Sequence, residues 1–464
     1  MVVTILAKVV SMNNLFRVKS ISLENYRGFE KHTFVFDDDD MSVFIGRNAS
    51  GKTAIIEAIN VMLGAYLAAY QHLVPGSEVA NLRASDVFQA LAPSFDREVV
   101  TSPFAPQYPC SVSCNLCIND KEFSFSRMLT KERGRTSFGG SNPMQPMVSR
   151  WERALMESGD SDKAIVLPLV LYFSSARLWN AGKKNSSFDL PKRSDGYRNC
   201  LNRERGIEWS FEYLKQLSII ASQENGQQAL PAYKAILSAI ETSMKEELPE
   251  GDSLEISYRY NGELVQKKKS GVTIPFSSLS DGYRNIIKVV TDIAVRMCVL
   301  NPHLKEEALS ETPGIVLIDE IDLSLHPTWQ RRIVNTLHEL FPKIQFICAT
   351  HSPFIIQSLQ PGELIPVGAQ IDTDYSGNSI EDIAEEIMGV EIPQYSEHKL
   401  QMYRAAEDYY RAVNKAESEE DIERLRVQLA ELSKRFGSNP AYYAFLEQEK
   451  IVRENKIKEN NETR

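Results

Sequence analysis

The feature that most restricts the fold of this chain is an eight-residue run between an apolar segment and an amphipathic one. Residues 46–53 read Gly-Arg-Asn-Ala-Ser-Gly-Lys-Thr and fit the pattern G-x-x-x-x-G-K-T. Residues 42–45 before the run are strand-like, and the apolar positions after it follow a helical period. A strand, this loop and a helix in that order predict a P-loop, in which backbone N–H groups and a helix N-terminus face phosphate oxygens.

The residue types in the loop predict how it binds a nucleoside triphosphate. We expect Lys52 to place its charge on the β- and γ-phosphates and the Thr53 hydroxyl to ligate Mg²⁺. The other loop residues are expected to contact the phosphates mainly through their backbone; they are Arg47, Asn48, Ala49, Ser50 and Gly51.

A second apolar segment ends in two carboxylates. Residues 315–318 read Ile-Val-Leu-Ile and are followed by Asp319 and Glu320. We expect Asp319 to hold the Mg²⁺ shell and Glu320 to orient or deprotonate the attacking water. The next apolar strand, 345–350, brings His351 to the edge of an open α/β sheet where ligands bind. At that place a contact with the γ-phosphate is favoured over a structural hydrogen bond.

Strand-like and helical segments alternate along the chain, which predicts an α/β core with buried strands. We expect residues 1–130 to form the half that carries the P-loop and residues 254–370 to form the second half. Residues 131–253 read as an inserted, largely helical and basic region with one core strand near 166–173. Residues 371–464 read as a helical region that binds a partner.

The composition is that of an ordinary globular protein. The 464 residues are 43% hydrophobic and 25% charged, and the net charge of −10 argues against a general nucleic-acid coat. Six cysteines in this length indicate a reducing compartment, and the longest apolar run, 164–173, is too short to cross a bilayer. We therefore expect a cytoplasmic protein with no membrane partner.

The order of the motifs resembles that of ABC-type ATPases of the SMC, RecF and OLD group. After the P-loop, the chain has Leu-Ser-Asp-Gly-Tyr-Arg at 279–284, Asp-Glu at 319–320 and Ala-Thr-His-Ser-Pro at 349–353. The resemblance implies an ABC-type head, in which a split P-loop core with mixed sheets binds ATP and Mg²⁺ and hydrolyses ATP to ADP and phosphate. The sequence does not place the Mg²⁺-contacting glutamine loop of that family.

The same resemblance implies that two copies of the chain pair around ATP. Ser280 and Gly282 would then reach the γ-phosphate held by the partner copy, and His351 would be the switch histidine. A homo-oligomer, at least a dimer, is therefore expected.

Further segments are similar to the PtuA-type ATPase subunits of Septu and retron-associated antiphage systems. They are Tyr172-Phe173 with Arg177-Leu178-Trp179, residues 319–327 and residues 379–383. This resemblance implies a separate HNH nuclease subunit, which the ATPase restrains or directs.

Two other patterns have a structural explanation that is favoured over a functional one. Cys110, Cys114 and Cys117 have a spacing that can hold an iron–sulfur cluster, but on a strand Cys117 would face away from the other two. Asp372 and Asp374 form a D-x-D of the kind used by OLD nucleases, but the sequence after them reads as helical. Buried thiols and a polar loop are the favoured interpretations.

The hexapeptide Ser-Asp-Gly-Tyr-Arg-Asn occurs twice, at 194–199 and at 280–285, and an apolar helix follows only the second copy.

Residues 127–205 carry 15 basic and 8 acidic side chains, so this stretch either contacts nucleic acid phosphates or is a solvated insert. Residues 371–464 carry 13 basic and 21 acidic side chains, which suits protein partners better than DNA, with plain helix packing as the alternative.

Three functions remain open from the sequence. The first is a regulatory ATP switch in antiphage defence that controls an associated nuclease. The second is a RecF-like ATPase of DNA maintenance, and the third is an OLD-type nuclease that acts on its own.

Overall fold

The structure is a computed structural model of the chain, which divides into two compact units, Met1–Ile383 and Ala384–Arg464. The four-part division expected from the sequence stays a prediction. The residues that the structure describes are 15–36, 40–91, 104–158, 165–179, 191–205, 207–223, 229–245, 251–257, 263–368, 378–390, 392–416, 418–436 and 440–462.

An antiparallel sheet with the strand order β2-β1-β6-β7-β8 forms one layer of the first unit. In β1, Phe16, Val18, Ile21 and Leu23 are buried, and the register shifts between Val18 and Ser20. The shift is a β-bulge, and it accounts for the change in the phase of the apolar residues between Val18 and Ile21. The strands are β1 (Phe16–Tyr26), β2 (Phe29–Val35), β6 (Cys110–Ile118), β7 (Lys121–Leu129) and β8 (Ser137–Phe138).

A parallel sheet with the order β15-β3-β14-β13-β9 forms a second layer. Four of its strands, β3, β9, β13 and β14, are buried along their whole length, which explains their continuous apolar sequences. Segments far apart in the sequence pair here, since β3 lies between β14 and β15, and β13 lies between β9 and β14. The strands are β3 (Met41–Ile45), β9 (Leu169–Phe173), β13 (Gly314–Ile318), β14 (Ile344–Ala349) and β15 (Leu364–Pro366).

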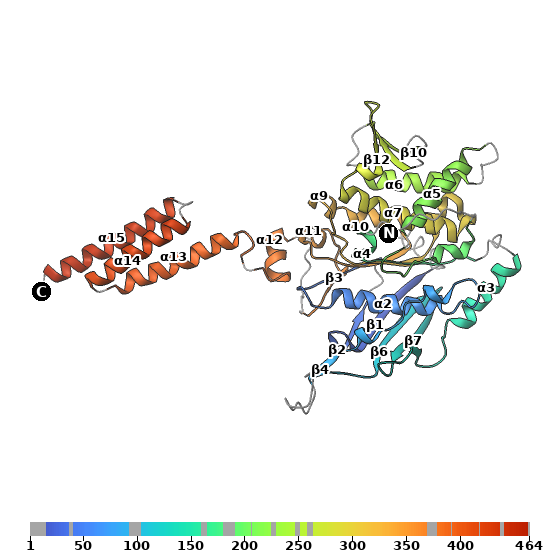
Figure 1. The fold of residues 1–464 in the computed structure, drawn as a ribbon, viewed down its shortest axis with the longest axis horizontal. Coiled ribbons are helices and arrows are strands. Elements are labelled where there is room, and N and C mark those ends of the chain that lie inside the picture. Colours follow the sequence, from blue (N-terminus) through green and yellow to red (C-terminus); the bar gives the residue numbers. More distant parts are fainter. Residues whose placement is uncertain are drawn as a thin grey trace, which may run out of the picture. The chain divides into compact units, whose positions relative to one another are not determined.

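Helix α2 (Lys52–Leu67) packs against strands of both sheets and lies between them (Figure 1). Every residue of this helix except Thr53 is buried, as expected for a helix that is apolar on all sides. The P-loop is thus anchored by a helix that is buried along nearly its whole length.

The helices α5 (Ile207–Ala221), α6 (Leu230–Met244) and α7 (Asp281–Leu300) pack on one another, and α7 also packs on β9 (Figure 1). A small antiparallel sheet of β10 (Ser253–Ser257), β11 (Glu263–Lys267) and β12 (Thr273–Pro275) precedes α7. The Asn-Gly pair at 261–262, a sequence typical of a hairpin turn, lies outside the described residues. The antiparallel pairing of β10 with β11 agrees with such a turn.

Shorter elements connect these layers. They are β4 (Gln89–Leu91), β5 (Phe104–Pro106), α3 (Gln145–Ser158), α4 (Ser175–Trp179), α8 (Ala308–Glu311), α9 (Pro327–Gln330), α10 (Ile333–Leu340), α11 (Pro353–Ile356) and α12 (Ile380–Asp382).

The second unit contains α13 (Glu397–Lys415), α14 (Glu419–Phe436) and α15 (Pro440–Glu462), each of which packs on the other two. Ile422, Leu425 and Leu429 of α14 are buried, as their helical spacing predicts, and Tyr409 of α13 lies in the same core. The predicted α/β class, with mixed sheets, a split P-loop core, a helical insertion and a helical C-terminal region, is confirmed. No helix in the described part of the chain combines the length and the apolar character that crossing a membrane requires.

Candidate functional site

The loop of residues 46–51 leaves β3 and enters α2 through two left-handed residues. Ala49 has φ +65° and Gly51 has φ +102°. A Cβ atom on Gly51 would also lie 2.6 Å from Cζ of Phe29. Both the backbone angle and the close aromatic ring require glycine at this position. The exposed residues Arg47, Asn48 and Ala49 lie on the outer side of the loop.

The Lys52 side chain lies across the loop that precedes it. Its Nζ donates to the carbonyl oxygens of Gly46 at 2.7 Å and of Arg47 at 3.3 Å. Burial lowers the pKa of Lys52, and the nearby carboxylates of Asp319, Asp322 and Glu320 act in the opposite direction. The ammonium group is therefore held at the loop next to an acidic edge of the parallel sheet.

Thr53 and Asp319 meet although they belong to different halves of the core. Thr53 Oγ1 donates to Asp319 Oδ1 at 3.1 Å, and the Asp319 N–H donates to the Phe173 carbonyl at 2.8 Å. Asp319 is only 4% exposed, and burial raises its pKa to about 6, with smaller contributions from Glu320 and Glu57 and an opposing one from the Thr53 hydrogen bond. A cation bound beside this buried carboxylate stabilises its charged form.

Glu320 begins a tight turn after β13 with φ +57°, a strained angle for a residue with a side chain. In the same turn, Asp322 Oδ1 accepts hydrogen bonds from Thr350 Oγ1 at 2.6 Å and from the His351 N–H at 3.2 Å. Burial and then the charge of Lys52 lower the pKa of His351, which favours the neutral ring, whereas Asp322 and Glu320 act in the opposite direction. The turn after β13 and the residues after β14 are thereby fixed to each other.

The signature residues lie at the start of α7. Ser280 is exposed and precedes the helix, and its side chain makes no hydrogen bond to the helix N-terminus. Gly282 lies against the turn of residues 320–325, since a Cβ atom there would be 2.8 Å from the Ser324 carbonyl oxygen. Within the described ranges, no hydrogen bond joins Ser280 or Gly282 to the P-loop of the same chain.

An ion-pair cluster beside the site was not predicted from the sequence. Glu57, which is 5% exposed, pairs with Arg27 and, at 2.9 Å, with Arg203. Arg27 also pairs with Asp86 at 2.8 Å. Glu57 follows Thr53 by four residues on α2, so both side chains lie on the same face of the helix. That spacing is the signal in the sequence that points to Glu57.

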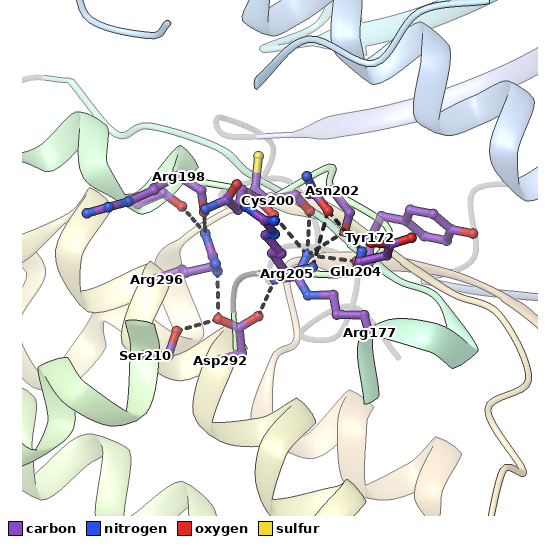
Figure 2. Close-up of polar contacts among 12 residues, drawn as sticks. Tyr172, Arg177, Arg198, Cys200, Asn202, Glu204, Arg205, Ser210, Asp292 and Arg296 are labelled. Atoms are coloured by element: carbon purple, nitrogen blue, oxygen red, sulfur yellow. Dashed lines mark hydrogen bonds and ion pairs between the residues drawn. The ribbon is translucent and has the colours of Figure 1, made fainter. Parts of the chain in front are cut away.

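Asp292 of α7 lies between two buried arginines (Figure 2). Arg177 Nη2 donates to Asp292 Oδ2 at 2.7 Å, and Arg296 Nε donates to Oδ1 at 2.7 Å. The Ser210 hydroxyl also donates to Oδ1, and the three charged side chains are 0% exposed. Two cations and one anion are therefore enclosed together.

Backbone carbonyls accept hydrogen bonds from the Nη1 groups of these arginines, whereas the buried Arg177 Nε has no partner among the described residues. Arg177 Nη1 donates to the carbonyls of Tyr172, Asn199 and Cys200, each at 3.0 Å. Arg296 Nη1 donates to the Gly196 carbonyl at 2.8 Å. The first copy of the hexapeptide, 194–199, is thus held against α7 and β9 as a structural segment.

Part of the positive charge in residues 127–205 is also structural. Arg127, Arg177 and Arg193 are buried and donate to backbone carbonyls. These three side chains are not available to nucleic acid.

Asp372 and Asp374, the D-x-D pair considered above as a possible nuclease motif, lie outside the described residues.

Two family models match parts of the chain. One, described as "AAA ATPase domain", matches residues 17–100, which include the P-loop. The other, described as "AAA domain, putative AbiEii toxin, Type IV TA system", matches residues 238–357, which include Ser280, Asp319 and His351.

Several named proteins are similar to the chain. "Retron Vc95 probable ATPase" of Vibrio cholerae serotype O1 biovar El Tor is 28% identical over 392 residues, which cover 75% of this chain and 72% of that protein. "Septu protein PtuA" of Bacillus thuringiensis is 30% identical over 130 residues, which cover 25% of this chain and 33% of that protein. A solved SMC head bound to the C-terminal winged-helix domain of ScpA aligns with a TM-score of 0.43 at 14% identity, over 76% of this chain and 94% of that one.

Proposed function

We propose that this chain, an ABC-type P-loop ATPase related to PtuA, is the ATP-hydrolysing switch of an antiphage defence complex. The observation that carries the proposal is the 3.1 Å contact between Thr53 Oγ1 and Asp319 Oδ1, with Lys52 and Glu320 beside it. The names of the relatives, retron ATPase and Septu PtuA, support the biological setting.

The residues at this place fit Mg²⁺ bound together with ATP. Thr53 offers a hydroxyl oxygen, and Asp319 offers a carboxylate whose burial makes a neighbouring cation favourable. Mg²⁺ bound there would neutralise charge on the phosphate oxygens. Thr53 and Asp319 are the residues proposed to hold it.

The roles of the other residues follow from their positions. Lys52 exchanges its contacts with the Gly46 and Arg47 carbonyls for phosphate oxygens, and the loop N–H groups surround the same phosphates. Glu320 takes the proton of the attacking water. His351, whose lowered pKa favours the neutral ring, hydrogen-bonds the γ-phosphate.

The signature residues act on the site of a second copy in this proposal. Ser280 is exposed, its hydroxyl does not cap its own helix, and α7 is 20 residues long, so its N-terminus offers a free hydroxyl and the positive end of a helix dipole. A γ-phosphate in the partner copy is the ligand proposed for Ser280 and Gly282. ATP would then join two heads.

The proposed output of the switch is a separate HNH nuclease subunit. The similarity to PtuA supports such a partner, and the acidic helical residues 371–464 are the region proposed to bind it. On α15 of that region, Phe445, Ile451 and Val452 are between 45% and 48% exposed.

The molecular mass in solution tests head pairing. We expect the Glu320→Gln variant to form a dimer or larger assembly with Mg²⁺-ATP and to return to smaller species when ATP is removed. The Glu320→Gln, Ser280→Arg double variant is the control, and it should bind ATP without assembling. An unchanged mass of the single variant with and without ATP would contradict pairing, and failure to co-purify with a co-expressed HNH protein would contradict the nuclease partner.

A further inference from the structure

The hydroxyl of Tyr172, in β9, is buried without a partner. The side chain is 0% exposed, and no group among the residues that the structure describes is within hydrogen-bonding distance of its oxygen. A buried hydroxyl that makes no hydrogen bond destabilises the folded protein, so its retention calls for another reason. In Figure 2 the ring points away from the Arg177–Asp292 ion pair, so that network does not use the hydroxyl.

The pairing of the strands places Tyr172 near Asp319, the carboxylate proposed to bind Mg²⁺. Tyr172 is opposite Leu317 in the parallel pair of β9 and β13, and Asp319 follows Leu317 by two residues. Side chains two residues apart along a strand direction share a face of the sheet. The hydrogen bond from the Asp319 N–H to the Phe173 carbonyl, at 2.8 Å, continues this register to the end of β9.

The charges around the hydroxyl agree with that placement. Burial raises the pKa of Tyr172 far above its usual value, and the carboxylates of Asp319 and Glu57 raise it further, whereas Arg203 and Arg27 lower it. The phenol is therefore neutral and can both donate and accept a hydrogen bond. The charges that act on it include Asp319, proposed to bind the metal, and the ion-paired Glu57 and Arg203.

We propose that Tyr172 is a positioning residue for the metal of the nucleotide site and that its hydroxyl hydrogen-bonds a water molecule held by Mg²⁺. The inference rests on the proposed binding of Mg²⁺-ATP at Thr53 and Asp319. Mg²⁺ keeps several water ligands when a protein supplies few side chains, and each ordered water needs an acceptor or donor in the protein. The Tyr172 hydroxyl can be this donor or acceptor, although its strand carries none of the nucleotide-binding motifs.

ATP binding with and without Mg²⁺ tests the inference. We expect Tyr172→Phe to weaken ATP binding in Mg²⁺ by about fivefold to tenfold, the loss of one hydrogen bond, and to leave ATP binding in EDTA unchanged. Isothermal titration calorimetry in the two buffers gives both affinities. Equal affinities for the wild type and the variant in Mg²⁺ would overturn the inference.

Thermal unfolding of the nucleotide-free protein separates this role from a structural one. Because the hydroxyl has no partner, Tyr172→Phe should unfold at the same temperature as the wild type or higher. A lower unfolding temperature would show that the hydroxyl stabilises the empty protein and would also overturn the inference.

Tyr26→Phe is the matched control. The Tyr26 hydroxyl is likewise 0% exposed and unpartnered among the described residues, but Asp319 is not among the charges that act on it. This variant should bind Mg²⁺-ATP as the wild type does. If the wild type itself binds ATP no more tightly in Mg²⁺ than in EDTA, the proposed metal site fails, which is a different result from a normal wild type and an unaffected Tyr172→Phe.

Discussion

Thr53 Oγ1 donates a 3.1 Å hydrogen bond to Asp319 Oδ1 across 266 residues of sequence. The two side chains come from α2 and from the end of β13, which the pairing of β3 with β14 and of β14 with β13 brings into one layer. The contact holds side by side the hydroxyl and the carboxylate that are proposed to share one Mg²⁺.

The first prediction concerns the stability of the Asp319→Asn variant. Because the pKa of Asp319 is about 6 in the folded protein and 3.8 without burial, the folded state holds the proton more tightly than the unfolded state does. The free energy of unfolding therefore falls as pH rises from about 4 to about 6, by roughly 3 kcal/mol from this group.

Asparagine cannot ionise, so the variant should lose this contribution to the pH dependence and should be more stable than the wild type at pH 7. Urea unfolding of both proteins at pH 5 and pH 7, without nucleotide, measures the difference. The same variant should lose the Mg²⁺ dependence of ATP binding. An identical change of stability with pH in both proteins would contradict the raised pKa.

The second prediction separates binding from hydrolysis. Lys52→Ala removes the ammonium group that lies on the Gly46 and Arg47 carbonyls, and it should weaken ATP binding by about tenfold to a hundredfold. Glu320→Gln keeps the shape of the turn and should bind ATP normally while hydrolysis slows by about a hundredfold or more. If Glu320→Gln hydrolyses ATP at the normal rate, the assignment of the base is wrong.

The third prediction uses the tight packing of Gly282. A Cβ atom at this position would lie 2.8 Å from the Ser324 carbonyl oxygen, so Gly282→Ala must displace either α7 or the turn that contains Glu320. We expect ATP hydrolysis to fall about tenfold to a hundredfold, whereas ATP binding to the single chain changes little because the P-loop is untouched. Steady-state hydrolysis and equilibrium binding give the two values.

Gly140→Ala is the control for this substitution. A Cβ atom at Gly140 would have nothing within 4 Å, so this variant should hydrolyse ATP as the wild type does. Equal effects of the two substitutions would show that the contact with Ser324 is unimportant.

The local motifs could be predicted from the sequence, whereas the contacts between distant segments could not. The P-loop and the carboxylates after β13 are recognisable because each combines a short pattern with a strand or a helix. The pair of Glu57 with Arg203 depends on where the inserted segment returns to the core, which no local pattern specifies. The unpartnered hydroxyl of Tyr172 is likewise visible only when its neighbours are known.

The repeated hexapeptide shows most directly that a local sequence does not determine the local structure. The same six residues begin a long helix at 280–285, where Ser280 and Asp281 are exposed, and form a short 3₁₀ helix and turn at 194–199, where Gly196 and Tyr197 are buried. What differs is the residue before each copy, since the buried Arg193 donates to the Leu300 carbonyl at 2.7 Å and fixes the first copy against the end of α7. Identical residues therefore take the structure that their flanks and contacts stabilise.

The last prediction concerns the two buried arginines that hold this segment. Asp292→Asn keeps the size of the side chain but leaves Arg177 and Arg296 enclosed without the carboxylate that pairs with both of them. Such a loss typically destabilises a protein by about 3 to 5 kcal/mol. Ser210→Ala, which removes one neutral donor from the same carboxylate, should cost only about 1 kcal/mol. Urea unfolding at pH 7 compares the two, and a similar small loss for both would mean that the backbone carbonyls alone, and not Asp292, compensate the arginine charges.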